Sequence, residues 1–331
     1  MDLVHVWLCL VGLVVILYVV LDGFSLGVGL LFPFAGNEAE RDELINSIAP
    51  VWDANQTWVV FGGGALFASF PLIYTVLFSA LYIPLLTFLF GLIFRGVAFE
   101  FRVNSSRKGV WNLAFFAGSL IATISQGFVL GAYLSGIQMD QNRFSGGAFD
   151  WLNAFSIMTG LALIAGYCLL GSTYLILKTT GNVQQRAFRQ AFWSAVAVTG
   201  FMGIVSIWTP IHDMSFVSRW MSEPRVYVVW MFPVMGIAAM TTLFIHLKKR
   251  SEIIPFISSL FVFLSAYLGL QAAIYPYVIL PSVTLYDAVA QTRTLEFTLW
   301  GVSICLPVIL AYIIYSYWVF RGKVGAEGLY H

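Results

Sequence analysis

The residues of this sequence best suited to chemistry are a few ionisable side chains that interrupt apolar segments. Asp22 follows the apolar run 17–21 and precedes Gly23, which places a carboxylate at an expected helix irregularity. Ionisable groups inside membrane segments are costly and are usually paired or functional. Two interpretations therefore stay open for Asp22: a carboxylate that accepts hydrogen bonds from freed backbone N–H groups, or a member of a proton or ion path.

The segment 50–58, Pro-Val-Trp-Asp-Ala-Asn-Gln-Thr-Trp, concentrates polar side chains at the start of an apolar stretch. Asp53, Gln56 and Thr57 are spaced i, i+3 and i+4, which puts them on one face of a helix. A carboxylate near a helix N-terminus also interacts favourably with the free N–H groups and the helix dipole. Asp53 is therefore either a capping acid or a proton-conducting or quinone-proximal group. Only the second interpretation accounts for so many polar residues beside two tryptophans.

A cluster of charges closes a later apolar segment at Arg95, Glu100 and Arg102. Arg95 lies deepest, and two arrangements are open for it. Its long side chain reaches the headgroup layer by snorkelling, or it forms an intramembrane ion pair with Asp53 or Asp22. Glu296 is interpreted as an interfacial cap of the last apolar segment.

Histidines and cysteines are placed unfavourably for binding a metal or a haem. The four histidines fall at segment ends, in loops or at the terminus: His5, His212, His246 and His331. Haem iron is commonly held by an axial His, Met, Cys or Tyr. The three cysteines are isolated in apolar runs without a CxxC pair. We expect no haem and no metal in this chain itself.

The elements that carry these residues are predicted from composition. Of 331 residues, only 10% are charged and 60% are hydrophobic. Soluble domains carry about 25% charged residues, so an ordinary soluble protein is excluded. The formal net charge of +1 gives no footprint for nucleic acid. The remaining class is an all-α polytopic membrane protein, which we interpret as one integral membrane domain over residues 1–331.

Nine apolar segments reach the length of a membrane-spanning helix, which is about 20 residues. They cover residues 4–32, 52–70, 72–95, 112–136, 151–177, 191–210, 226–246, 253–276 and 298–320. Pro71 is predicted to divide the second from the third with a very tight turn, because proline disrupts a helix interior. The N-terminal residues have no basic region and no cleavage site, and are interpreted as an uncleaved first span.

The distribution of Lys and Arg predicts the orientation. With the N-terminus outside, inner segments hold thirteen of the 17 basic residues, whereas outer segments hold Arg143, Arg219, Arg225 and Arg293. The excess of positive charge on cytoplasmic loops then favours nine spans with the C-terminus inside. Glycines at 23, 27, 29 and 62–64 are interpreted as sites of close helix packing.

Together, these stretches resemble subunit II of the cytochrome bd family of quinol oxidases over almost the full length. The resemblance is carried by the segments 22–29, 45–58, 62–71, 91–102 and 276–282. The segments 203–210 and 319–324 resemble its cyanide-insensitive branch most closely.

The resemblance implies a fold of two four-helix bundles plus one peripheral helix, in the bacterial cytoplasmic membrane. It implies a partner, subunit I, which holds haem b and haem d (or b-type variants) and the quinol site. Small single-span accessory subunits and a structural quinone also occur in the family. By analogy Asp53 belongs to the proton path, with Asp22 a second candidate. Trp52 and Arg95 would lie near a structural quinone or the subunit interface.

Two positions depart from the family pattern. Ser25 stands where an aspartate is common, and Ala54 stands where glycine is usual. The implied function is that of a non-haem subunit of an enzyme that oxidises quinol, reduces O2 to water and generates proton motive force. The alternative is a stand-alone secondary transporter, because glycine-interrupted spans with intramembrane acids also occur in that class. No inverted repeat is evident in the sequence to support it.

Overall fold

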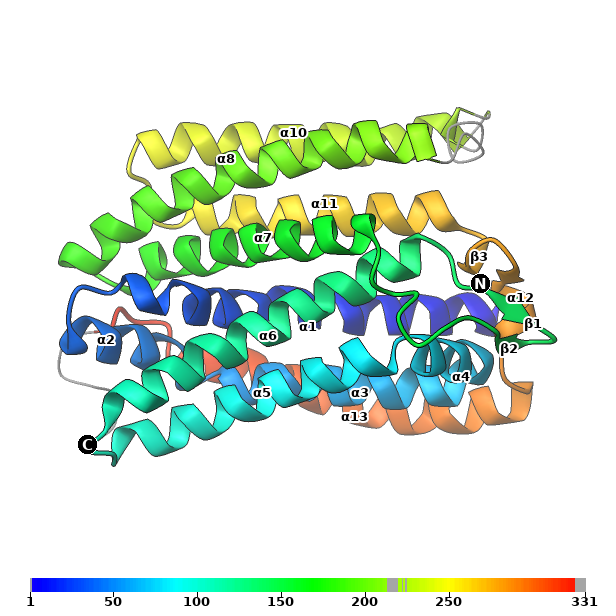
Figure 1. Ribbon diagram of the computed structural model, residues 1–331, viewed down its shortest axis with the longest axis horizontal. Helices are drawn as coiled ribbons and strands as arrows, with labels where there is room; N and C mark the ends of the chain where they lie inside the picture. Colours follow the sequence, from blue (N-terminus) through cyan, green and yellow to red (C-terminus); the bar gives the residue numbers. More distant parts are fainter. Residues whose placement is uncertain (1, 213–219, 222, 224, 325–331) are drawn as a thin grey trace.

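The computed structural model of the chain describes residues 2–212, 220–221, 223 and 225–324. Most of the described chain is helical, and the long helices lie side by side along one axis (Figure 1). They are α1 (Leu3–Leu31), α3 (Trp52–Ser69), α5 (Tyr82–Val103), α6 (Lys108–Leu134), α7 (Ala154–Lys178), α8 (Gly181–His212), α10 (Arg225–Lys248), α11 (Ile254–Ile274) and α13 (Thr292–Val319). Arg219 and His331, named above, lie outside the described residues.

Short elements connect these helices. They are the 3-10 helix η1 (Phe32–Phe34), α2 (Glu38–Ile48), α4 (Pro71–Ala80) and α12 (Leu285–Ala288). Two antiparallel hairpins lie at the same end as the N-terminus (Figure 1). In the first, β1 (Met139–Asp140) pairs with β2 (Arg143–Phe144), with Met139 opposite Phe144. In the second, β3 (Tyr277–Ile279) pairs with β4 (Val283–Thr284), with Tyr277 opposite Thr284.

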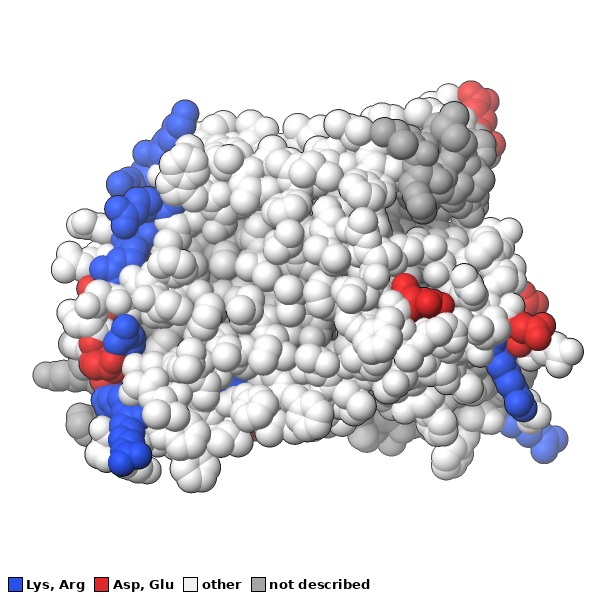
Figure 2. All heavy atoms as spheres, viewed as in Figure 1, with Lys and Arg blue, Asp and Glu red and all other residues white. Residues whose placement is uncertain are grey.

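The prediction of an all-α polytopic membrane protein is confirmed. Eight helices of the described ranges are long and apolar enough to cross a membrane, while α3 is not among them and α4 is a shorter apolar helix. Charged side chains gather at the two ends of the molecule and leave a wide uncharged band between them (Figure 2). Such a band is what a hydrocarbon core requires of the protein surface.

The predicted boundary between the second and third spans is wrong in its detail. Pro71 does begin a new helix, where its missing N–H has no cost. That helix, α4, continues only to Ala80, and a second break at Leu81 precedes α5. Figure 1 shows α4 beyond the end of α3, with α5 running back from there beside α6. The third span thus starts at Tyr82 and reaches Val103 rather than covering 72–95.

Other helices extend beyond their apolar windows. The segment predicted as 191–210 begins at Gly181, because a helix continues through polar residues as long as its backbone hydrogen bonds do. Gln184 and Arg186 lie in this added stretch, and both bond to residues outside the helix. Hydropathy therefore located the apolar centre of this helix but not its ends.

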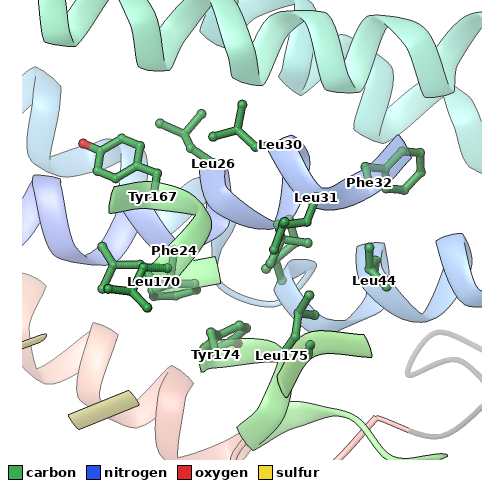
Figure 3. Close-up of a cluster of buried hydrophobic side chains, with 14 of the residues drawn as sticks. Phe24, Leu26, Leu30, Leu31, Phe32, Leu44, Tyr167, Leu170, Tyr174 and Leu175 are labelled. Atoms are coloured by element: carbon green, nitrogen blue, oxygen red, sulfur yellow. The ribbon is translucent and has the colours of Figure 1, made fainter. Parts of the chain in front are cut away.

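The core forms around α1, which packs against α3, α6 and α7. Figure 3 shows the second half of α1 facing Tyr167–Leu175 of α7, with Leu44 of α2 closing one end. Phe24 stacks on Tyr174 with ring centroids 4.1 Å apart. A Cβ added at Gly27 would lie 1.8 Å from the carbonyl oxygen of Tyr167, so only glycine allows this approach. Close packing is thus confirmed for the glycines of α1.

The glycines of α3 behave differently. A Cβ added at Gly63 or Gly64 would meet nothing within 4 Å. At Gly62 an added Cβ would lie 3.2 Å from Val14 of α1, so close packing within the chain holds for Gly62 but does not account for Gly63 and Gly64.

Candidate functional site

Asp22 sits at the centre of a buried polar network. Its side chain is 0% exposed, and that of Arg95 is 1% exposed. Arg95 Nη1 donates to Asp22 Oδ1 over 2.9 Å, and Ser25 Oγ donates to the same oxygen over 2.8 Å. Arg95 Nη2 also donates to Ser25 Oγ over 2.7 Å. Of the arrangements open for Arg95, the structure has the ion pair with Asp22, not snorkelling and not a pair with Asp53.

The network continues across the membrane interior through two tyrosines and a glutamine. Tyr18 OH donates to Asp22 Oδ2 over 3.1 Å, and Gln126 Nε2 donates to Tyr18 OH over 3.3 Å. Tyr167 OH donates to Gln126 Oε1 over 2.7 Å. These bonds link α1, α5, α6 and α7 through side chains alone. We call Tyr18, Asp22, Ser25, Arg95, Gln126 and Tyr167 the buried network.

Sequence reasoning missed three members of the buried network. Tyr18 lies four residues before Asp22 and so shares its helix face, a signal that was available. Gln126 and Tyr167 come from distant segments, and only Gln126, a polar residue inside an apolar run, gave a hint. Ser25, one turn beyond Asp22, bonds both charged partners.

Aromatic rings separate the buried network from the end of the molecule rich in Lys and Arg. Phe99 lies one turn from Arg95 and one turn from Arg102 on α5. Phe32 packs edge-on to Phe115 at 5.1 Å, and the centroids of Phe99 and Phe115 are 6.2 Å apart. All three rings are buried. The three rings thus form a buried apolar layer between Arg95 and Arg102.

Beyond the aromatic layer, a second cluster joins α2 to α5 and α6. Arg102 Nη2 lies 2.9 Å from Glu38 Oε2, and its Nη1 lies 2.5 Å from Asp42 Oδ1. Arg102 Nε also donates to Asn112 Oδ1 over 2.6 Å. Burial raises the pKa of the Glu38 carboxyl, but bonds and charge attraction from Arg41 and Arg102 outweigh it and hold the pKa below its usual value.

A neighbouring carboxyl on α2 is fixed in the same manner. Gly36 N–H donates to Glu40 Oε2 over 2.6 Å, and Arg186 of α8 pairs with the same oxygen. The backbone bond from Gly36, followed by the bond from Arg186, lowers the pKa of Glu40. Charge-assisted bonds of this kind favour the ionised form. The acids of α2 thus act as ties between helices.

Asp53 has a different environment. It lies in the first turn of α3 and is exposed, and no described residue bonds to its side chain. The helix N-cap is Val51, without a side-chain cap, while Asp53 lies in the first turn, where a carboxylate interacts favourably with the helix dipole. Thr57, one turn further, is exposed as well. The polar helix face predicted for Asp53, Gln56 and Thr57 is therefore only partly formed. Gln56 is half-buried, while Asp53 and Thr57 are exposed.

The other polar residues of the segment 52–58 turn inward. Asn55 is fully buried, where its Nδ2 donates to Leu21 O over 2.8 Å and its Oδ1 accepts from Tyr317 OH over 3.0 Å. Asn55 therefore joins α1, α3 and α13. Trp58 Nε1 and Gln56 Nε2 are buried and have no hydrogen-bond acceptor among the described residues.

Trp52 and Arg95 come close in space but do not share a site. Trp52 is half-buried, with its ring 5.0 Å from that of Phe99. A Cβ added at Gly96 would lie 3.4 Å from the Trp52 ring, whereas Arg95 turns to Asp22 on α1. A shallow apolar cavity of about 530 Å³ lies elsewhere, on α10 at Val226–Ala238. In the described ranges, no group of three or more His, Cys, Asp or Glu is placed to hold a metal ion.

The fold and this set of buried charges define the class of protein: a multi-pass membrane protein with a polar network inside a helix bundle. The family model of cytochrome bd terminal oxidase subunit II matches residues 3–320, and the chain belongs to this family. It is therefore a subunit of a quinol oxidase of the bd type, located in the inner membrane.

Known relatives agree with this assignment. Cytochrome bd-I ubiquinol oxidase subunit 2 of Escherichia coli K12 is 27% identical, covering 98% of this chain and 96% of the relative. Cytochrome bd ubiquinol oxidase subunit 2 of Bacillus subtilis 168 is 30% identical, covering 96% of each. Among solved structures, a chain of the bd oxidase from Geobacillus thermodenitrificans is 17% identical with a TM-score of 0.80, covering 98% of this chain and 100% of that chain. That likeness supports the fold.

Proposed function

We propose that this chain is the non-haem half of a quinol:O2 oxidoreductase and brings protons from the inner side to its haem-bearing partner, subunit I. The observation that carries the proposal is the outward face of α3, formed by Asp53, Thr57, Val60, Gly64 and Phe67. These residues are all exposed in the isolated chain. They follow one another at intervals of three and four, and so form one stripe along the helix. We call this stripe the open face of α3.

The open face has the composition of a helix contact rather than of a lipid contact. Gly63 and Gly64 leave open space beside the helix, and small residues of this kind let another helix approach closely in a membrane. Next to α3, the outer side of α13 exposes Phe297, Trp300 and Ile304. The names of the relatives call them subunit 2 of an oxidase, which implies at least one further subunit. A partner docked here would cover both helices.

Asp53 is suited to carry protons because its carboxyl forms no hydrogen bond or ion pair with a described residue. An exposed carboxylate at the edge of the hydrocarbon region is unfavourable when it faces lipid. A partner with polar groups or water at this point would stabilise it and leave it free to gain and lose a proton. The carboxylate of Asp22, in contrast, accepts three hydrogen bonds from fixed donors. We therefore propose Asp53 for the proton path, and a fold-maintaining role for Asp22.

The cofactors of the enzyme are proposed to lie in subunit I. Haem b and haem d, or b-type variants, would supply quinol oxidation and O2 reduction there. The residues considered for a structural quinone do not fit one well: Arg95 already directs Nη1 and Nη2 to Asp22 and Ser25. We assign no step of the reaction to a quinone in this chain. Single-span accessory subunits remain an expectation of the family resemblance alone.

We further propose nine membrane crossings, with α3 and α4 together forming one of them. The N-terminus would be outside and the C-terminus inside, since the end of the molecule opposite the N-terminus carries most Lys and Arg (Figures 1 and 2). Quinol oxidation near the outer face would then release protons outside. Protons for water would be taken from the inside, which generates proton motive force.

Site-specific cross-linking tests the docking face. A photo-reactive amino acid at Val60 of α3, 75% exposed, is compared with one at Ile207 of α8, 65% exposed. After illumination of membranes, the chain is purified and its absorption spectrum is recorded, reduced minus oxidised. We expect a covalent adduct with a haem-bearing protein from position 60 and none from position 207. An adduct only from position 207, or purification without any haem protein, would contradict the proposal.

A further inference from the structure

The inner end of α13 is fastened to the rest of the chain by a buried lysine. Lys178, the last residue of α7, is 8% exposed. Its Nζ donates to the carbonyl oxygens of Phe320 and Gly322, the latter over 3.2 Å. In return, Val324 N–H donates to Lys178 O over 2.8 Å, and Val324 is 3% exposed. We call residues 320–324 the C-terminal strap; the sequence analysis singled out this tail without giving it a role.

The chemistry of Lys178 suits this fastening. A buried ammonium group is costly unless it is paired or hydrogen-bonded. Here its described partners are carbonyl oxygens that follow the last turn of α13, and Lys178 itself ends α7. Helix C-termini carry partial negative charge and free carbonyl groups, and a cation stabilises both. One lysine therefore joins two helix ends that are far apart in sequence.

α13 depends on such a tie because packing holds it only weakly. Within α13, the buried residues are Leu295, Ile313 and Ser316 alone. In membranes, helix association comes from close packing and interhelical hydrogen bonds, and α13 has little of the first. Its outer end is tied by Ala290 N–H to Ser69 O over 2.9 Å and by Trp7 Nε1 to Leu295 O over 3.3 Å. At the inner end, the bonds of Lys178 to the strap join three others, from Ser316 Oγ to Pro50 O, from Tyr317 OH to Asn55 Oδ1 and from Lys323 Nζ to Glu252 Oε1.

We propose that Lys178 is a positioning residue: through the strap it fixes the inner end of α13 and thereby sets the surface that α13 and α3 offer to subunit I. The second part rests on the proposed function, whereas the fastening itself does not. Tyr317 OH, which bonds Asn55 beside Asp53, lies one turn before the strap. Release of the strap would therefore also loosen the helix beside the open face of α3.

Cysteine labelling in the assembled enzyme tests the fastening. Val324 is changed to Cys in a chain with Cys9→Ser and Cys305→Ser, and Cys168 is kept as an internal reporter of α7. A membrane-impermeant maleimide is applied to inside-out vesicles. We expect Lys178→Met to raise the labelling rate at position 324 by about tenfold or more, as expected for the loss of hydrogen bonds to a charged group. Cys168 should stay unlabelled, and Lys178→Arg should restore most of the protection.

A matched control removes an exposed charge at the same end. Lys249 is exposed, and Lys249→Met should leave the labelling at position 324 unchanged. Unchanged labelling at position 324 in Lys178→Met would show that Lys178 does not fasten the strap. Labelling of Cys168 in the same variant would show that the change is not confined to the strap.

Recovery of the haem-bearing partner tests the positioning role. We expect Lys178→Met, and independently a chain shortened to residue 321, to lower the amount of haem recovered per subunit at least threefold. Release of position 324 with full haem recovery would overturn the positioning role and leave only the fastening. If the unaltered chain recovers no haem protein at all, the proposed function fails, while the labelling result still decides the fastening.

Discussion

Two acidic residues that look alike in the sequence have opposite environments in the fold. Asp22 is fully enclosed and accepts bonds from Arg95, Ser25 and Tyr18. Asp53 is exposed on α3 and bonds to no described residue. Arg95 of α5 pairs with Asp22, whereas Asn55, on the same helix as Asp53, turns inward and leaves Asp53 on the outside. Asp22 thus links helices through its hydrogen bonds, whereas the carboxylate of Asp53 has no bond to a described residue.

The difference indicates that the hydrogen-bond partners of an acidic side chain, rather than its depth in the membrane, point to its role. The carboxylate of Asp22 is held by three donors, one of which is the Arg95 guanidinium. The carboxylate of Asp53 has no partner among the described residues, and under the proposed function subunit I faces it. The aromatic layer of Phe32, Phe99 and Phe115 strengthens the contrast, since it places buried apolar rings between Arg95 and the charges at the inner end.

The largest effect is expected from breaking the Asp22–Arg95 pair. Arg95→Met leaves a fully buried carboxylate without its cation, which costs about 3–5 kcal/mol. We expect the subunit to be degraded or to fail in assembly, measured as chain and haem recovered from membranes. The double variant Asp22→Leu with Arg95→Met removes both charges and should recover a large part of the loss. Full recovery of assembly and low turnover in the double variant would instead place Asp22 on the proton path.

A smaller loss is expected at Asn55, which lies between the two regions. Asn55→Ala removes the bonds to Leu21 O and Tyr317 OH and should cost about 1–3 kcal/mol, because the buried groups that it leaves are unsatisfied. The thermal midpoint of the purified complex measures this loss. Tyr317→Phe removes a single bond and should lower the midpoint less. Equal losses in both variants would show that Asn55 does not tie α1 to α3.

A still smaller effect is expected from the buried tyrosines. Tyr18→Phe removes the bond to Asp22 and should cost about 1 kcal/mol with turnover close to that of the unaltered enzyme. Oxygen consumption per haem measures the second part. If turnover falls tenfold while the complex stays assembled, the buried network conducts protons, and the contrast between the two acids is lost.

The smallest effect concerns Glu40 of α2, which is partly buried and paired, unlike Asp53. The pKa of Glu40 lies below its usual value of 4.5 because Gly36 and Arg186 bond its carboxylate. The stabilisation by Glu40 is therefore present above pH 4.5 and is lost as the pH falls through the lowered pKa. Thermal midpoints between pH 7 and pH 4 should decline less steeply in Glu40→Gln. Parallel curves would mean that this tie does not contribute.

Sequence alone predicted the class of fold and the family, for identifiable reasons. Low charge and long apolar runs are direct properties of the chain, and they determine the membrane class. The family resemblance rests on local motifs such as the segment 45–58. The presence of acids at 22 and 53 was equally visible, since few charges interrupt the apolar segments.

The environments of those acids were not predictable in the same way. Whether Arg95 meets Asp22 or Asp53 depends on how α1, α3 and α5 pack, and one sequence holds no such information. Gln126 and Tyr167 join the buried network from other helices for the same reason. The break at Leu81 was missed, although Pro84 marks it. A proline at this position cannot donate to the carbonyl of Ala80 and therefore falls in the first turn of a new helix.

The most direct test of the central claim compares Asp53→Asn with Asp140→Asn, a matched change of an exposed acid in the outer hairpin. Quinol-dependent oxygen consumption per haem is measured in purified complexes, together with proton uptake from the inner side. We predict that Asp53→Asn assembles normally but turns over at least about tenfold more slowly, the range expected for loss of a proton-transfer group. Asp140→Asn should match the unaltered enzyme. Normal turnover and proton uptake in Asp53→Asn would contradict the account.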